Sequence, residues 1–288
     1  MRRPRPVVAL AGLAALTTPQ LACAPTDTDA AAAMQEHDGP VHFVRYEMAG
    51  ETSYGILDGP TITPIYGDIF GKHSLTNESV ALASVTLLPP TDPEKVIAVG
   101  LNYLSHIGNA EPAAEPGLFA KYPTSLIGHE QDIITPQGAS PLHFEGELVV
   151  VIGKTCSKVS KADALDCVFA VTAGNDVSER RWQRTDLQWL RAKGSDTFGP
   201  VGPSMVVGLD PDDLLVQTRV NGEVMQSERT SDLIFDVPTM ISYISQYFTL
   251  KAGDMIFTGT PGSTRGMNPG DVVEIEVEGV GVLRNTVR

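Results

Sequence analysis

Two glutamates two residues apart precede an apolar segment of the chain. Glu145-Gly146-Glu147 is followed by "LVVVIG", a continuous apolar run with the length of a buried strand. If the strand includes Glu145, residues two apart project to the same face, and both carboxylates would lie side by side. Packed without a partner they would repel each other and one would take up a proton, whereas a divalent cation removes that cost. From its spacing the pair is a candidate metal site, and the alternative is two carboxylates on the polar face of an ordinary strand.

A third carboxylate, Asp176, follows another apolar segment, "VFAVTAG", just before a charged stretch with helical spacing. The alternative role for this region is capping of that helix by Asn175, Asp176 or Ser178, which needs no metal. Together with Glu145 and Glu147, Asp176 would complete a ligand set made only of oxygen. Such a set favours Mg²⁺ or Mn²⁺, with Ca²⁺ also compatible, over zinc.

Two further side chains could move protons or hold charge near such a site. His106 follows the apolar run from Val96 to Val99, where a strand is expected to turn into a loop or a short helix. It is a candidate general base, and its alternative is a structural or surface histidine. Lys193 lies in "RAKGSDTFGP", which is expected to be a glycine-rich loop. Its ammonium could stabilise a developing oxyanion, and its alternative is a solvated lysine.

Two other patterns are interpreted as structural. Glu274, Glu276 and Glu278 alternate with valine and isoleucine, as on a strand with one buried and one solvated face. The glycines of "TGTPGSTRGMNPGD" lack both the Gly-Lys-Ser/Thr ending and the following helix of a phosphate-binding loop. The sequence also has no nucleophile elbow and no His-Glu-x-x-His pattern.

The elements that would position these residues are mainly strands. Short strand-like runs from Val41 to Leu88 predict a small β-rich module over 41–90, and the stiff segment from Pro89 to Pro93 predicts a boundary. The remainder, 91–288, holds further short strands, with a hairpin expected at Asn221-Gly222. Helices are expected only in "KADALDCVFA", in "SERRWQRTDLQWLR" and from Pro238 to Phe248. The predicted fold class is α+β, mainly β.

Nine segments in order resemble the fumarylacetoacetate hydrolase family, specifically its smaller acylpyruvase and oxaloacetate decarboxylase-like branch. Within 41–288 they read "KVIAVGLNYLSH", "LFAKYPTSLIG", "HFEGELVVVIGK", "GNDVSERRWQ", "KGSDTFGPVGP", "VNGEVMQ", "TSDLIF", "LKAGDMIFTGTPG" and "GDVVEIEVEGVGVLRNTV". The resemblance implies a mixed β-roll or sandwich catalytic domain, a small N-terminal β-domain and a homodimer.

The resemblance also assigns expected roles to residues. It implies a Mg²⁺ or Mn²⁺ site at Glu145, Glu147 and Asp176, a catalytic His106, and Lys193 beside the metal. The positions expected to face substrate or metal are Tyr103, Arg180, Gln183, Thr197 and Thr260.

One position departs from the family pattern. Many members carry a glutamate three residues after the histidine, and this dyad activates water, but here the position is Asn109 and the nearest acid is Glu111. On a helix, a residue at i+3 faces the histidine and one at i+5 does not. Hydrolysis of a C–C bond in a 2,4-dioxo acid of the acylpyruvate or fumarylpyruvate type, through an enolate that the cation stabilises, is the first expectation. The alternatives are decarboxylation or isomerisation of an oxo acid at the same site, or an exported protein that binds a metal or oxo acid without catalysis.

Charge and the first residues bear on partners and location. The net charge of −14 argues against a nucleic-acid partner, and no apolar run is long enough for a permanent membrane span. Arg2, Arg3 and Arg5, followed by an apolar stretch and small residues, predict a signal peptide and spacer over 1–40 and an exported, periplasmic protein. Cys23 could carry a lipid anchor, and the alternative is a cytoplasmic protein that starts at Met34.

Two cysteines lie further along the chain. Cys156 and Cys167 lack metal-pair spacing, and their separation neither demands nor forbids a disulfide. The simpler interpretation is two small buried residues.

Overall fold

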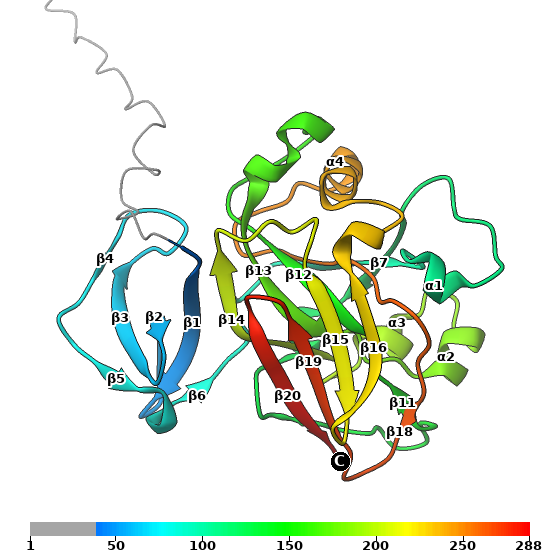
Figure 1. Cartoon of the computed structure of the whole chain (residues 1–288), viewed down its shortest axis with the longest axis horizontal. Helices are drawn as coiled ribbons and strands as arrows, with labels where there is room; N and C mark the ends of the chain where they lie inside the picture. The colour runs from blue at the N-terminus through cyan, green and yellow to red at the C-terminus, as the bar shows by residue number, and fades with distance from the viewer. Residues whose placement is uncertain (1–38) are drawn as a thin grey trace, which may run out of the picture.

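The computed structural model describes residues 39–288, so the predicted signal peptide, Cys23 and the spacer up to Asp38 lie outside the described residues. The described chain is mainly β, as predicted, and no helix in it is long and apolar enough to cross a membrane. Figure 1 shows a small N-terminal part beside a larger body built from the rest of the chain.

The N-terminal part is a set of short antiparallel strands with one 3₁₀ turn. Its elements are β1 (Val41–Met48), β2 (Glu51–Asp58), β3 (Thr61–Gly67), β4 (His73–Leu75), β5 (Val80–Ala81), η2 (Leu82–Ser84) and β6 (Thr86–Leu87). In the larger body the first half comprises β7 (Val96–Gly100), α1 (Leu104–Ile107), β8 (Gly117–Lys121), η3 (Pro123–Ser125), β9 (Leu126–Ile127), β10 (Asp132–Ile133), β11 (Leu142–His143), β12 (Gly146–Ile152), η4 (Lys161–Cys167) and β13 (Val168–Asn175). The second half comprises α2 (Arg180–Thr185), α3 (Leu190–Gly194), β14 (Gly199–Val207), β15 (Leu215–Val220), β16 (Glu223–Arg229), η5 (Thr230–Asp232), α4 (Val237–Tyr247), β17 (Met255–Phe257), β18 (Gly266–Met267), β19 (Val272–Val277) and β20 (Gly281–Val287).

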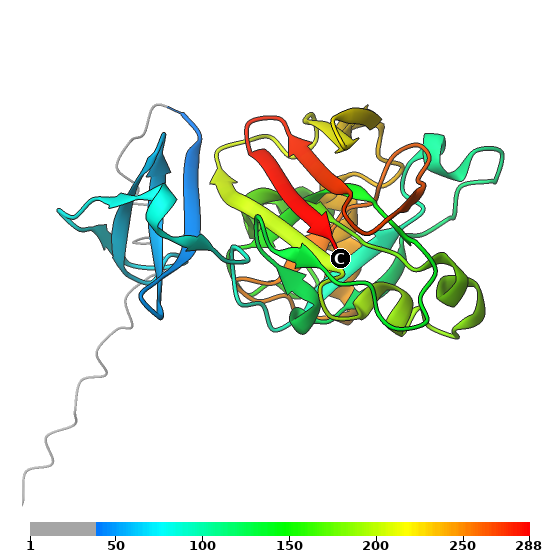
Figure 2. The same cartoon turned by 90° about the horizontal axis from the view of Figure 1, so that it is seen from below.

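Two large sheets form most of residues 39–288, and β11 and β18 pair as a separate two-stranded sheet. The larger has the strand order β4-β3-β2-β1-β14-β13-β12-β17-β7-β8, and the smaller has the order β10-β20-β19-β15-β16. Strands β12, β13 and β14 contact β15, β19 and β20, so the sheets pack against each other over a shared apolar core. The turned view in Figure 2 shows the N-terminal strands continuing beside this sandwich, where β1 pairs with β14.

Strand β12 is buried on both faces and positions Glu147 near its start. Every residue from Gly146 to Ile152 is buried, which confirms the prediction of a strand covered on both faces. Leu148, Val150 and Ile152 belong to the core between the sheets, whereas Val149 packs in the cluster on the opposite face. Because side chains alternate, Glu147 lies on the same face as Val149. That face leads into a cavity that Glu147 and His106 line.

A hairpin, the alternating pattern of one strand and one helix are confirmed as predicted. Asn221 and Gly222 both have positive φ, at 52° and 83°, and they join β15 to β16 as expected for a two-residue hairpin. In β19, Val273, Ile275 and Val277 are buried, while Glu274 and Glu276 form ion pairs with Arg219 on the outer face. The helix expected from Pro238 to Phe248 is α4, which Asp236 caps.

The other two expected helices are shorter than predicted. "KADALDCVFA" is a 3₁₀ helix only up to Cys167, after which the chain enters strand β13. "SERRWQRTDLQWLR" divides into α2 and α3, because Trp189 adopts a left-handed conformation with φ 57° between them. The expected loop around Lys193 is wrong, since Lys193 belongs to α3.

Candidate metal centre and active site

The three predicted ligand carboxylates meet at one end of the β12–β13 pair. Glu145 directly precedes β12, Glu147 is its second residue, and Asp176 follows β13. These strands are antiparallel, with Gly146 opposite Asn175, so the start of one and the end of the other share an edge. One oxygen from each carboxylate lies within 4.8 Å of the others, and all three side chains are buried.

Backbone contacts hold this arrangement in place. The N–H of Asp176 donates to the carbonyl of Glu145 at 2.9 Å, and the N–H of Glu145 donates to Oδ1 of Asn175 at 2.9 Å. The predicted cap role falls to another residue, because Glu179 caps α2 by accepting from the N–H of Trp182. Asp176 is therefore left facing the cluster.

Three cationic side chains contact the carboxylates. Lys193 Nζ donates to Asp176 Oδ2 at 2.6 Å and to Glu145, and Arg180 donates to Glu145 Oε1 at 2.5 Å. Lys121 Nζ donates to Asp176 Oδ1 at 2.5 Å and to the carbonyl oxygen of Lys193 at 2.5 Å. Three cations thus contact Glu145 and Asp176 within a buried cluster.

The charges act differently on the two glutamates. Burial alone would raise the pKa of Glu145, but Lys193 and Arg180 outweigh it and hold that pKa below the ordinary value. Burial, followed by the charges of Asp176 and Glu145, raises the pKa of Glu147 well above the ordinary value. The Glu147 carboxylate accepts a hydrogen bond from the N–H of Gly259, at 2.8 Å. Glu147 is the carboxylate that most lacks positive charge.

The cluster fits a hard divalent cation. Oxygens that share one Mg²⁺, Mn²⁺ or Ca²⁺ at about 2.0–2.6 Å lie at most about 4–5 Å apart, which the observed spacing meets. The donor set contains only carboxylate oxygens, the type these ions prefer. A cation there would also neutralise Glu147, whose buried charge is otherwise poorly matched.

His106 and the cluster line the same cavity. Its lining also includes Arg180, Gln183 and Thr260, with Phe119 and Trp189 as an aromatic wall. His106 Nδ1 lies 2.7 Å from the carbonyl oxygen of Gly262. Because a carbonyl only accepts, this contact places the proton on Nδ1 and leaves Nε2 as the basic nitrogen of the neutral ring.

The other expected site residues are distributed unevenly. Arg180 donates to Gln183 Oε1 at 2.8 Å, and Thr260 donates to the carbonyl of Gly146 at 2.9 Å, so these three border the cluster. Tyr103 is buried at the start of α1 and does not line the cavity. The hydroxyl of Thr197 accepts from the N–H of Ile134 at 2.9 Å and is also absent from the lining.

Sequence reasoning missed Lys121 and Gln226. Lys121 stands in "LFAKYPTSLIG", where a lysine that ends an otherwise apolar strand is the only local signal. Gln226 Nε2 donates to Thr260 Oγ1 at 2.8 Å and Gln226 Oε1 accepts from the N–H of Gly146 at 3.1 Å. It lies 80 residues from Gly146 along the chain, so no spacing pattern could have indicated this contact.

The fold and the site define a protein built on a mixed β-sheet with a buried carboxylate cluster beside a histidine and lysines. The family described as fumarylacetoacetate (FAA) hydrolase C-terminal matches residues 95–288, and the family described as Rv2993c-like, N-terminal, matches residues 41–90. The chain belongs to the fumarylacetoacetate hydrolase family.

Individual relatives agree with this family. Protein Rv2993c of Mycobacterium tuberculosis is 47% identical over 223 residues, which are 76% of this chain and 84% of that protein. The mitochondrial oxaloacetate tautomerase FAHD2A of Bos taurus is 40% identical over 220 residues, 71% of this chain and 70% of that protein.

Solved structures give the same result. The 2-hydroxyhepta-2,4-diene-1,7-dioate isomerase of Mycobacterium marinum is 42% identical with a TM-score of 0.80, covering 86% of this chain and 98% of that one. The maleylpyruvate hydrolase of Sphingobium sp. SYK-6, solved with manganese (II) and pyruvate, is 27% identical with a TM-score of 0.71, covering 85% and 98%. Members of the family thus include isomerases, tautomerases and hydrolases of small oxo acids.

Proposed function

We propose that this protein is a divalent-metal-dependent tautomerase, isomerase or decarboxylase of a small dicarboxylic 2-oxo acid. The observation that carries the proposal is the convergence of Glu145, Glu147 and Asp176 in one cavity with His106 and Lys193. Within residues 39–288, no carboxylate forms a hydrogen bond with His106, and Asn109 stands where a dyad glutamate would be. This favours proton movement on an enolisable acid over activation of water.

Charge balance supports a dianionic substrate. With Glu147 ionised beside a cation, the charges of the three carboxylates cancel those of Lys121, Arg180 and Lys193, so a bound Mg²⁺ or Mn²⁺ would leave two positive charges. A 2-oxo dicarboxylate carries two negative charges at neutral pH and would restore neutrality in the buried cavity. Two relatives at 40–42% identity, an oxaloacetate tautomerase and a hydroxyheptadienedioate isomerase, act on acids of this kind.

The residues of the chain have distinct roles in this proposal. Glu145, Glu147 and Asp176 would hold the cation, which when bound supplies Lewis-acid polarisation of the carboxylate and 2-oxo oxygens. His106 Nε2 accepts and returns the proton at the carbon next to the oxo group. Lys193 keeps its ammonium beside the cluster and donates to the developing oxyanion. Arg180, supported by Gln183, is placed to receive a substrate carboxylate.

A product assay tests the function. The purified protein with Mg²⁺ or Mn²⁺ is given enol-oxaloacetate, an unsaturated hydroxy-dienedioate and a set of acylpyruvates, and products are identified by NMR. We expect enol–keto conversion, double-bond migration or CO₂ release. Cleavage of acylpyruvates into pyruvate and a carboxylic acid instead would establish the C–C hydrolase, the second candidate, in which His106 deprotonates water. Binding that stabilises the protein without turnover of any compound would indicate a non-catalytic oxo-acid binder.

Replacement of the histidine separates its role from metal binding. His106→Asn should lower turnover about 10²–10⁴-fold while Mn²⁺ still stabilises the protein, because the histidine moves protons and does not ligate. His73→Asn is the control, since His73 lies in β4 of the N-terminal part. Full turnover by His106→Asn would remove His106 from the mechanism.

Assembly as a homodimer is part of the same proposal. The support is the resemblance to the family, and sedimentation velocity of the full chain measures it. A single species with twice the mass of the chain is expected.

A further inference from the structure

The connection between β12 and β13 contains a disulfide. Cys156 and Cys167 are bonded, eleven positions apart in sequence, and their residues are 3% and 1% exposed. Their interpretation as two small buried residues is right about burial but incomplete, because the side chains are covalently joined. Both cysteines lie in the main apolar core with Ile152, Ala164 and Leu250.

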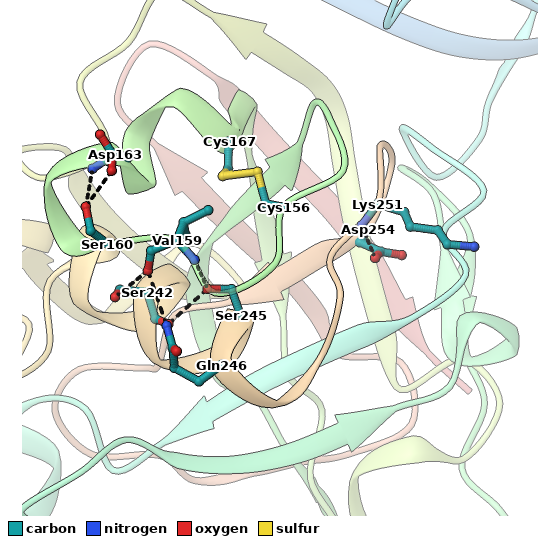
Figure 3. The surroundings of a disulfide bond; sticks show 10 residues. All are labelled: Cys156, Val159, Ser160, Asp163, Cys167, Ser242, Ser245, Gln246, Lys251 and Asp254. Atoms are coloured by element: carbon teal, nitrogen blue, oxygen red, sulfur yellow. Dashed lines mark hydrogen bonds between the residues drawn. A yellow bond between two sulfur atoms is a disulfide. The ribbon is translucent and has the colours of Figure 1, made fainter.

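The disulfide lies where the connection docks on α4. Figure 3 shows the bond beside hydrogen bonds from Val159 to the helix: its N–H donates to Ser245 Oγ at 3.1 Å, and its carbonyl accepts from Ser242 at 3.0 Å. Cys156 exchanges two backbone hydrogen bonds of 2.9 Å with Leu250, and Gly153 donates to the carbonyl of Cys167 at 2.8 Å. The bond therefore closes a loop whose two ends are already fixed to the core.

This environment is that of a structural disulfide and not an exchange-active one. Reactive cysteines are partly exposed and stand in electropositive surroundings, often in a Cys-x-x-Cys pair. Here both sulfurs are covered by apolar side chains, so a thiolate from solvent cannot reach them without local unfolding. Once formed, the bond is protected by the fold.

We propose that Cys156 and Cys167 are joined as the chain folds in an oxidising compartment, where the bond closes the loop of the β12–β13 connection that packs on α4. The two thiols together lose two protons and two electrons, and the electrons reduce the disulfide of an exchange partner to two thiols. Disulfides of this buried type persist in the cell envelope or outside the cell, whereas the cytosol of most organisms keeps thiols reduced. The inference is independent of the reaction at the carboxylate cluster. It favours export, to which the arginines and apolar stretch before residue 24 also point, over a cytoplasmic start at Met34.

Thiol counting tests where the bond forms. The full chain and a chain that starts at Met34 are produced in the same bacterial host, quenched in acid, and labelled with a maleimide polymer under denaturing conditions, before and after reduction. The full chain, with Cys23→Ser to remove the third cysteine, is expected to gain two labels on reduction. The Met34 chain, confined to the cytosol, is expected to carry both labels without reduction. A complete disulfide in the Met34 chain, or free thiols in the full chain, would overturn the compartment assignment.

Thermal unfolding tests whether the disulfide stabilises the folded protein. Cys156→Ala/Cys167→Ala is expected to unfold about 5–10 °C below the disulfide-bonded protein, as a loop of this length predicts. A phosphine reductant at 25 °C should leave the folded protein oxidised and act only during heating. If the double variant does not fold, the wild type heated with and without the phosphine provides the same comparison. An unchanged unfolding temperature, or rapid reduction of the folded protein, would refute a buried disulfide that stabilises the fold.

Discussion

Glu147 is the carboxylate of the proposed metal site whose buried charge is least compensated. Its carboxylate is buried, faces two other carboxylates and accepts from the N–H of Gly259. Burial of a charge is costly unless a counter-charge offsets it, and the three cations of the cluster contact Glu145 and Asp176 instead. A dication bound here would therefore offset the charge of Glu147 most directly.

Replacing this carboxylate by an amide should separate metal binding from folding. Glu147→Gln keeps the shape and can still accept from Gly259, but it removes the charge, so the protein should fold and lose its stabilisation by Mn²⁺. For the wild type, Mn²⁺ at about 100 times its dissociation constant should add about 2.7 kcal/mol. Thermal unfolding with and without Mn²⁺ measures this, with Glu276→Gln on the outer face of β19 as control. Equal stabilisation of Glu147→Gln and wild type would contradict the metal site.

Lys121 is the second residue whose change is informative. It gives Asp176 one of its two ammonium partners and also holds the backbone of α3 at Lys193, so it fixes two elements of the site. Burial lowers the pKa of Lys121, although the charge of Asp176 opposes this. Lys121→Met should lower Mn²⁺ affinity about 10–100-fold, as loss of a group that orients a ligand does. Calorimetric titration measures the affinity.

The matched control is Lys161→Met. Lys161 pairs with Asp236 at 2.7 Å on the surface, and such exposed pairs contribute about 0–1 kcal/mol. It should bind Mn²⁺ like the wild type. If Lys121→Met also binds Mn²⁺ unchanged, Lys121 serves the fold and not the site.

The carboxylates were predictable from sequence, but the lysine partner was not. Glu145 and Glu147 are two residues apart at the start of an apolar strand, and Asp176 follows a second apolar strand. Lys121 is 55 residues from Asp176, and the two meet only through the pairing of the strands between them. Local patterns indicate which groups end a strand, whereas the strand order decides which ends coincide.

At the scale of elements, the junction of β1 with β14 ties the N-terminal strands to the main sheet. His42 lies opposite Val206 in this pairing, and its Nδ1 contacts Ser204 Oγ at 3.0 Å. Burial lowers the pKa of His42 below 6.5, so its protonated form is disfavoured in the folded protein. Here the unfolded chain binds the proton more readily.

The free energy of unfolding should therefore decrease as the pH falls below 6.5. The contribution of His42 is fully present above pH 6.5 and is lost as pH falls through that value towards its folded-state pKa. His42→Gln should flatten this part of the pH profile relative to wild type, which urea unfolding between pH 5 and pH 8 measures. Identical pH profiles would show that the histidine is not protonated differently in the two states.

Helical elements were harder to predict than strands. The sequence from Ser178 to Arg191 has helical composition throughout, yet Trp189 at positive φ separates α2 from α3 and packs against Phe119 in the cavity wall. The tertiary contact overrides the local propensity, and α3 then presents Lys193 to the cluster. The strands agree better because burial on both faces leaves a strong apolar signal, as in β12.

At the scale of the whole molecule, residues 41–90 complete the fold of 91–288. Strand β1 covers the edge of β14, and Phe43 and Ile69 share an apolar cluster with Val151, Ala170 and Met205 of the larger part. An uncovered strand edge with apolar neighbours favours association with other chains. Within residues 39–288, the contacts of the carboxylate cluster come from residues beyond 91, so its geometry does not depend directly on the N-terminal strands.

A chain that starts at residue 91 should therefore keep the carboxylate cluster but aggregate in solution. We expect light scattering to show aggregation, because the edge of β14 and one face of Met205 become exposed. The fraction that stays in solution should still bind Mn²⁺, since every carboxylate and cation of the cluster remains. The control is the full chain with Tyr66→Ser, which changes an exposed side chain of β3 and leaves β1 paired. A truncated protein that is monodisperse and unfolds at the wild-type temperature would show that the two parts are energetically independent.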